Sequence, residues 1–87
     1  MELYKEIEKS FSKIEKLFSD EGLLEFSQTL PGDLSKFDMG LGTMVRLKFL
    51  RPKSVLYRKF VESGFDGDRY KMSAVILQLF HYSLNRV

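Results

Sequence analysis

The sequence predicts an all-α fold, a small bundle of about four helices, and three observations lead to this prediction. Apolar residues recur every three or four positions in several segments, turn signals separate these segments, and no segment shows the alternation that marks a strand. The composition of 44% hydrophobic and 30% charged residues is typical of a folded domain. A chain of 87 residues has room for one core, so residues 1–87 are expected to form a single helical domain.

The first predicted helix covers residues 2–19 and is amphipathic. Its apolar residues recur at helical spacing: Leu3, Tyr4, Ile7, Phe11, Ile14, Leu17 and Phe18. Glutamates and lysines are mixed on the remaining face at spacings that favour ion pairs along a helix, which is typical of a solvated surface. Gly22 then ends this helix or lies in a turn before the short apolar stretch 23–26.

The second predicted helix covers residues 33–50. A turn precedes it, because Pro31 disfavours helix at the residue before it and Asp33 is suited to cap a new helix. The apolar series of this helix again has a spacing of three or four: Leu34, Phe37, Leu41, Met44, Val45 and Phe49. Pro52 stops the helix, because proline cannot continue the backbone hydrogen bonding.

Two glycines, Gly40 and Gly42, lie inside this second helix and require a reason. A glycine in a helix interior costs roughly 1 kcal/mol relative to alanine. One interpretation is close packing, since a neighbouring helix or a partner can approach a residue without a Cβ. The other is a local kink, or a short turn at 36–38 before the helix proper begins at about Met39.

Two further helices are predicted over residues 54–63 and 68–85. Ser54 is suited to cap the first of them, and Gly64 to follow its end in the left-handed conformation. Asp68 or Asp66 caps the last helix. That helix is apolar over much of its circumference, which places it centrally in the bundle.

The residue types present exclude many chemistries. Without cysteine there is no disulfide, thiolate metal site or cysteine nucleophile, and a single histidine argues against zinc sites that need two or more. His81 has no acid three or four residues away to orient it as a base, so a surface or partly packed role is expected. We therefore expect no catalytic residues, no metal and no cofactor, and a protein that works by binding rather than an enzyme.

Two short motifs carry no ligand site of their own. The Asp66-Gly67-Asp68 turn is followed by two cations instead of the acid that completes a calcium loop. The Gly40-Leu41-Gly42 segment follows no strand and lacks the third glycine and the lysine of phosphate-binding loops.

No secretory signal pattern opens the sequence, and no apolar run approaches the length of a membrane span. A cytoplasmic protein without membrane contact is therefore expected.

The charges divide unevenly along the chain. Residues 1–38 carry nine acids against five lysines, a net charge of −4, whereas residues 39–87 carry nine bases against three acids, a net charge of +6. Either the two halves attract each other within the domain, or each presents a face of one sign to a partner.

The basic segment 46–59 is the best argument for nucleic-acid binding. Its cations are Arg46, Lys48, Arg51, Lys53, Arg58 and Lys59. A helix-turn-helix would pair the helices 33–50 and 54–63. The connection contains proline, the second helix is short, and it offers few of the amides that read base edges. The pattern indicates a basic surface more than specific recognition.

Residues 37–46 resemble a motif of small bacterial helical proteins, F-x-x-G-x-G-x-x-[IV]-R. In that group an acidic turn followed by a small residue and an aliphatic run comes next, as in 66–68 and 73–77 here. The resemblance covers about residues 33–86. Where the group usually has asparagine after the arginine and a late tryptophan, this chain has Leu47 and Phe80.

Proteins of this size and kind resemble the immunity proteins of bacterial contact-dependent growth inhibition, which bind and neutralise the toxin domain encoded beside them. The resemblance therefore implies a cognate protein toxin as the partner. If the toxin is a nuclease, its substrate groove is basic, and the acidic first third of this chain is the natural face to occupy it. The partner-binding residues expected on this hypothesis are Glu2, Glu6, Glu15, Asp20, Glu21 and Glu25.

Arg46 lies between two apolar residues of the second predicted helix. An arginine in such a position most often pairs with a nearby acid, so we expect it to bind Asp38 or an acid of the turn 66–68 and to hold the bundle together. The alternative is a direct role of Arg46 in binding.

Overall fold

A computed structural model describes residues 2–86 and shows an all-helical fold, which confirms the predicted class. Its α-helices are α1 (Glu2–Glu15), α2 (Asp20–Gln28), α3 (Thr43–Phe49), α4 (Val55–Glu62) and α5 (Arg69–Asn85). A 3-10 helix, η1 (Pro31–Phe37), and a short π-helix, η2 (Asp38–Gly42), lead into α3. The described part of the chain contains five α-helices where about four were predicted, and it contains no strand.

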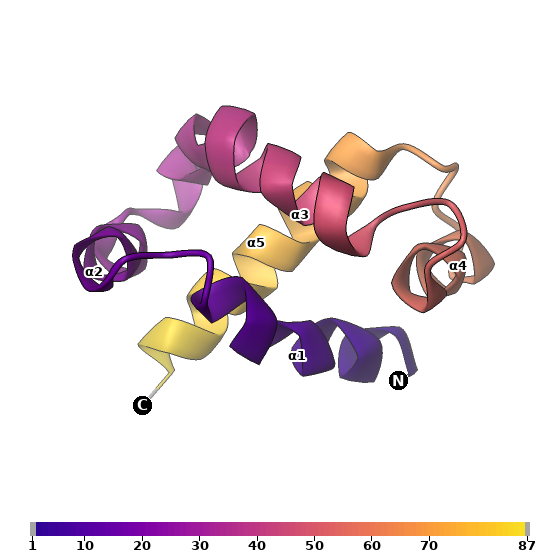
Figure 1. The fold of residues 1–87 in the computed structure, drawn as a ribbon, viewed down its shortest axis with the longest axis horizontal. Coiled ribbons are helices and arrows are strands. Elements are labelled where there is room, and N and C mark those ends of the chain that lie inside the picture. Colours follow the sequence, from indigo (N-terminus) through magenta and orange to yellow (C-terminus); the bar gives the residue numbers. More distant parts are fainter. Residues whose placement is uncertain (1, 87) are drawn as a thin grey trace.

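The last helix, α5, runs through the middle of the molecule (Figure 1). It contacts α1, α2, α3, η1 and η2, which confirms its predicted central position. Its buried side chains include Met72, Ile76 and Phe80, and they face the core over the whole length of the helix. In Figure 1, α3 crosses α5 near the beginning of α5 and α1 crosses it nearer its C-terminal end, while α2 and α4 lie at the two ends of the molecule.

The prediction of one helix over residues 2–19 is wrong at its end. The first helix stops at Glu15, and α2, which was not predicted, begins at Asp20. Ser19 adopts an extended conformation and its Oγ accepts a hydrogen bond from the backbone N–H of Gly22 at 3.0 Å. This cap and the acidic first turn of α2 start a new helix, so Gly22 lies inside α2 and ends neither helix.

The second predicted helix, 33–50, exists as a helical run with three different pitches. The run begins as η1 at Pro31, passes through η2 and becomes α-helical only at Thr43. The uniform α-helix expected from the spacing of three and four is therefore wrong before residue 43. The interpretation of a local irregularity at the glycines is closer to what the structure shows.

The remaining two predicted helices have their expected boundaries within one residue. Ser54 caps α4 by accepting from the Tyr57 N–H at 3.1 Å, and Gly64 follows the helix with a φ of 102°. Of the two candidate caps for α5, Asp68 is the one that accepts from the N–H groups of its first turn.

The buried apolar side chains form one cluster to which every helix contributes. Phe26 from α2 lies at its aromatic end, with ring centroids 4.9 Å from Phe37 and 5.7 Å from Phe80. Phe18, in the turn between α1 and α2, packs on Phe26 at 5.3 Å. This packing fixes α2 against the bundle although its sequence signal is short.

No helix within residues 2–86 is both long enough and apolar enough to span a bilayer.

The two glycines of the 31–49 run differ in their surroundings. A Cβ at Gly42 would lie 2.9 Å from Asp38 Oδ1 and 3.1 Å from Arg46 Nη1, whereas a Cβ at Gly40 would meet nothing within 4 Å. Gly42 is therefore required by the close approach of these two charged groups, which bond to each other at 2.9 Å.

We predict that Gly42→Ala destabilises the protein by about 1–2 kcal/mol, because the added methyl group displaces the Asp38–Arg46 pair. The matched variant Gly40→Ala gains up to about 1 kcal/mol from helix propensity alone. Urea unfolding followed by circular dichroism measures both. Equal stability of the two variants would contradict the steric explanation.

Candidate protein-binding surfaces

Arg46, the last residue of the resemblance motif, is not a surface cation. It is only 8% exposed, and its Nη1 donates to Asp38 Oδ1 and to Ser73 Oγ, each at 2.9 Å. Its Nη2 donates to the Asp38 carbonyl at 3.2 Å and to Thr43 Oγ1 at 3.1 Å. The pairing with Asp38 is one of those predicted and joins α3 to η2, whereas the bond to Ser73 joins α3 to α5.

Tyr70 covers the outer side of this guanidinium. The ring centroid of Tyr70 lies 4.1 Å from Arg46 Cζ, which is the distance of a cation–π contact. The turn 66–68, the other predicted source of an acid, forms a different ion pair, between Asp66 and Lys71 at 3.8 Å. The contacts of Arg46 within residues 2–86 thus hold neighbouring elements of the fold together.

The acids predicted to bind a partner fall into two groups. Glu2 accepts a hydrogen bond from Lys59 Nζ at 2.9 Å, and Glu6 bonds to Lys9 Nζ at 3.1 Å. The hydrogen bond from Lys59 and its positive charge hold the pKa of Glu2 below its ordinary value. The same pair raises the pKa of Lys59. Lysines therefore partly neutralise the acids at the start of α1, and Glu2 links α1 to α4.

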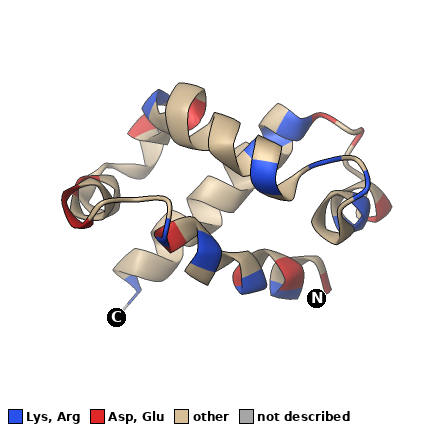
Figure 2. Ribbon diagram, in the orientation of Figure 1, with Lys and Arg blue, Asp and Glu red and all other residues tan. Residues whose placement is uncertain are grey.

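The other predicted acids lie around α2. The exposed residues of this helix recur at helical spacing and form its outer face: Asp20, Glu21, Leu24, Glu25 and Gln28. None of the ion pairs formed within residues 2–86 includes an acid of this face. Figure 2 shows this negative charge at the end of the molecule that α2 occupies. Glu15, the remaining predicted acid, ends α1 and is exposed.

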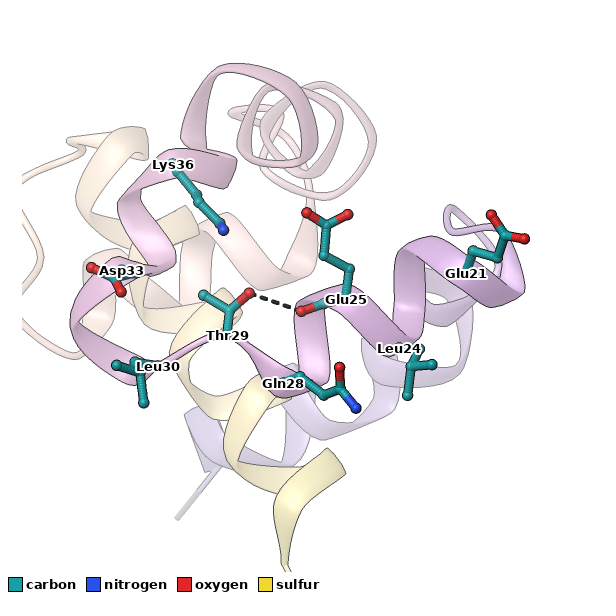
Figure 3. A pocket seen from close by; sticks show the side chains of 8 residues that line it. All are labelled: Glu21, Leu24, Glu25, Gln28, Thr29, Leu30, Asp33 and Lys36. Carbon is teal, nitrogen blue, oxygen red and sulfur yellow. Dashed lines mark hydrogen bonds between the residues drawn. The ribbon is translucent and has the colours of Figure 1, made fainter.

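A shallow hollow lies between α2 and η1, and Figure 3 shows the side chains that line it. They are Glu21, Leu24, Glu25, Gln28, Thr29, Leu30, Asp33 and Lys36. Leu24 is 58% exposed and Leu30 69% exposed, so two leucines lie among three acids and one lysine. We call this region the acidic hollow. The prediction that Asp33 caps a helix is wrong, because Asp33 lies inside η1, whose start at Leu30 has no side-chain cap. The turn at Pro31 was predicted, but the position of Asp33 beside α2 depends on how α2 and η1 pack together, which the linear sequence does not reveal.

The six cations of the basic segment 46–59 are not brought together. Arg46 is buried, and Lys59 is engaged by Glu2 and also lies 3.8 Å from Glu62. The other four remain exposed, on α3, on α4 and on the connection between them: Lys48, Arg51, Lys53 and Arg58. Two of the six cations that a helix-turn-helix would use to bind nucleic acid, Arg46 and Lys59, are therefore already paired within the protein.

His81 is buried and holds α2 to α5. Its Nε2 lies 2.7 Å from the Thr29 carbonyl at the end of α2, and its ring packs edge-on against Phe26 at 5.5 Å. Asn85, one turn further along, donates to the Ser27 carbonyl at 3.0 Å. Of the two placements expected for His81, at the surface or partly packed, the structure agrees better with the packed one. Its Nε2 faces a backbone carbonyl. Within residues 2–86, no three His, Asp or Glu side chains gather as metal ligands.

Comparison with known families gives a match over residues 5–84 to a model described as "Domain of unknown function (DUF6794)". The matched stretch contains the Asp38–Arg46 pair, the acidic hollow and nearly all of α1. No curated protein and no solved structure matches the chain.

We predict that Arg46→Ala lowers the free energy of unfolding by about 2–3 kcal/mol, because the buried Ser73 and the partly exposed Asp38 lose their common partner and the buried guanidinium leaves a gap. The exposed Arg58→Ala serves as the control and changes stability by less than about 0.5 kcal/mol. Thermal and urea unfolding measure both variants. If Arg46→Ala kept its melting temperature within a degree or two and lost binding to a partner, the structural role would be wrong.

The Glu2–Lys59 pair predicts a pH dependence with a defined sign. Because the pKa of Glu2 is lowered in the folded state, the stabilisation by the pair is present above the unfolded pKa and is lost as pH falls through the folded pKa. Because the pKa of Lys59 is raised, the same stabilisation is lost again as pH rises through the folded pKa of the lysine.

In Lys59→Met, the pKa of Glu2 returns toward the value of about 4.3 found in peptides. A titration of the Glu2 side-chain carboxyl carbon by NMR in the wild type and in the variant measures this change. An unchanged pKa of Glu2 in Lys59→Met would show that the pair does not persist in solution.

Proposed function

The chain belongs to the family described as a domain of unknown function (DUF6794), and we propose that it is an immunity protein that binds and neutralises a cognate bacterial toxin domain. The toxin proposed is a nuclease of a contact-dependent growth inhibition system. Binding through the acidic hollow occludes the active site or substrate groove of the nuclease in the cytoplasm.

The observation that carries this proposal is the exposed, unpaired negative charge of α2 beside two exposed leucines. The acids of α2 are free of ion pairs in the described chain, although lysines neutralise those at the start of α1. Leu24 and Leu30 supply apolar contact area between these charges. A surface of apolar residues within a charged rim is typical of a protein interface. Its negative charge complements the positively charged substrate groove of a nuclease.

The size of the molecule is compatible with a tight inhibitor. A standard interface buries about 800 Å² on each partner, and the described chain exposes 5917 Å². The acidic hollow would form the centre of such an interface, with the outer face of α2 on one side and η1 on the other. The acids would also accelerate association with a basic partner by electrostatic steering.

Nucleic-acid binding through residues 46–59 receives less support. Its two most enclosed cations, Arg46 and Lys59, already have partners within the protein. The experiment below distinguishes nucleic-acid binding from toxin binding.

The test is an affinity capture from the source bacterium with the tagged protein, washed at low and at high salt. We expect one protein to be retained in fixed ratio through high salt, because a packed interface loses mainly association rate when charges are screened. Its expression alone should arrest growth of a host cell, and co-expression of this chain should restore growth. Nucleic acid recovered only at low salt would replace the proposed function by the nucleic-acid alternative.

Charge reversal locates the binding site. We predict that Glu21→Lys/Glu25→Lys abolishes both capture of the partner and rescue of growth, because it places cations opposite the positively charged substrate groove of the nuclease. The matched control Glu8→Lys/Glu62→Lys makes the same change of net charge at exposed helix positions outside the acidic hollow and should retain both. Equal effects of the two variants would show that net charge, and not the acidic hollow, governs binding.

A further inference from the structure

A second surface of opposite character lies between α1 and α3. The groove between these two helices is lined by Lys13, Leu17, Leu47, Lys48, Phe49 and Arg51. We call this surface the basic groove. It continues toward α4, and Glu6, the one acid among the described residues that line this continuation, is already bonded to Lys9. Figure 2 shows cations on both helices that border it.

The cations of the basic groove are available to a ligand. Lys13, Lys48 and Arg51 take part in none of the ion pairs within residues 2–86. The Nε of Arg51 donates to the Leu47 carbonyl at 2.9 Å, which holds the guanidinium at the C-terminal turn of α3. Leu47 is 57% exposed. The groove therefore offers an apolar floor with three positive charges around it.

The floor of the groove favours a protein ligand over a nucleic acid. Single-stranded nucleic acids stack their bases on exposed aromatic rings. Here the apolar residues are mainly aliphatic, Leu17 and Leu47, and the only ring, Phe49, is half-buried against the core. Aliphatic contacts with surrounding cations instead fit a short helix that carries acids on either side of a leucine.

The outer face of α2 has this composition. Asp20, Glu21 and Glu25 surround Leu24 on it, so three acids and a leucine face solvent together. Three negative charges and a leucine on α2 thus complement the three positive charges and the exposed Leu47 of the basic groove. Within one molecule α2 cannot leave its place to reach the groove, because Phe26, His81 and Asn85 hold it on α5.

We propose that the basic groove binds α2 of a second copy of this chain. Two different surfaces of the same molecule then meet, a heterologous association in which each copy has one donor face and one acceptor groove. The inference does not rest on the proposed function, and it adds a regulatory consequence to it. A partner that occupies α2 competes with the second copy, so partner binding dissociates the assembly.

The test mixes two variants, each of which lacks one half of the contact. Glu21→Lys/Glu25→Lys removes the donor face and keeps the groove, and Lys48→Glu/Arg51→Glu does the reverse. In sedimentation velocity at low salt and about 200 µM protein, we expect the wild type to associate and each variant alone to be monomeric. The mixture should form a one-to-one complex, because the intact groove of the first variant accepts the intact α2 of the second.

The control variant is Lys53→Glu/Arg58→Glu, which reverses two exposed cations outside the groove and should associate like the wild type. Circular dichroism confirms that all variants are folded. The dissociation constant of the wild type should rise roughly tenfold between low salt and about 0.5 M salt, because exposed charges are screened. A monomeric wild type, or a mixture of the two variants that stays monomeric, would overturn the proposal.

The result is independent of the proposed function. Lys48→Glu/Arg51→Glu should lose self-association and still capture the protein partner through its unchanged acidic hollow. If this variant lost the partner and the wild type remained monomeric, the basic groove would be the site of a different protein and self-association would be rejected.

Discussion

The arrangement of the bundle depends on the buried guanidinium of Arg46. It bonds Asp38 in η2, Thr43 at the start of α3 and Ser73 in α5, so one side chain joins two consecutive elements, η2 and α3, to the central helix. A buried arginine is tolerated only when its donors are satisfied, and this one has four acceptors and the ring of Tyr70. The glycine at position 42 follows from this requirement, because a methyl group there would meet both charged groups.

This burial also changes how the unequal charges of the chain should be understood. Residues 1–38 carry a net charge of −4 and residues 39–87 one of +6. Both interpretations of this difference, attraction between the two parts and separate faces of one sign, hold in part. Lys59 bonds Glu2 across 57 residues, and the two halves do attract each other there. The charges that stay exposed collect elsewhere, as acids on α2 and as cations of the basic groove, so the internal attraction leaves two surfaces of opposite sign.

Local signals in the sequence were sufficient for part of the fold. Ser54, Gly64 and Asp68 each act within four residues of their own position, and the helices they bound were predicted to within one residue. The boundary between α1 and α2 was missed because the apolar spacing continues through Leu17 and Phe18, although Ser19 followed by two acids was a usable capping signal. The mixed pitch of the 31–49 run and the pairing of Glu2 with Lys59 depend on contacts with distant residues, which a periodicity of three and four does not encode. For the same reason the acidic hollow could be predicted only in its α2 half.

The acids of α2 are held on a rigid support, and this determines what the surface is suited to do. Phe26 anchors the helix in the aromatic cluster, while His81 and Asn85 face the backbone carbonyls at its end. A helix of nine residues has little stability of its own, so its position depends on these contacts. Because the backbone that carries Glu21, Leu24 and Glu25 is already ordered, binding through this face costs little additional conformational entropy. The core contacts of α2 thus hold this face in a fixed conformation, which would favour either of the two proposed associations, with a toxin domain or with the basic groove of a second copy.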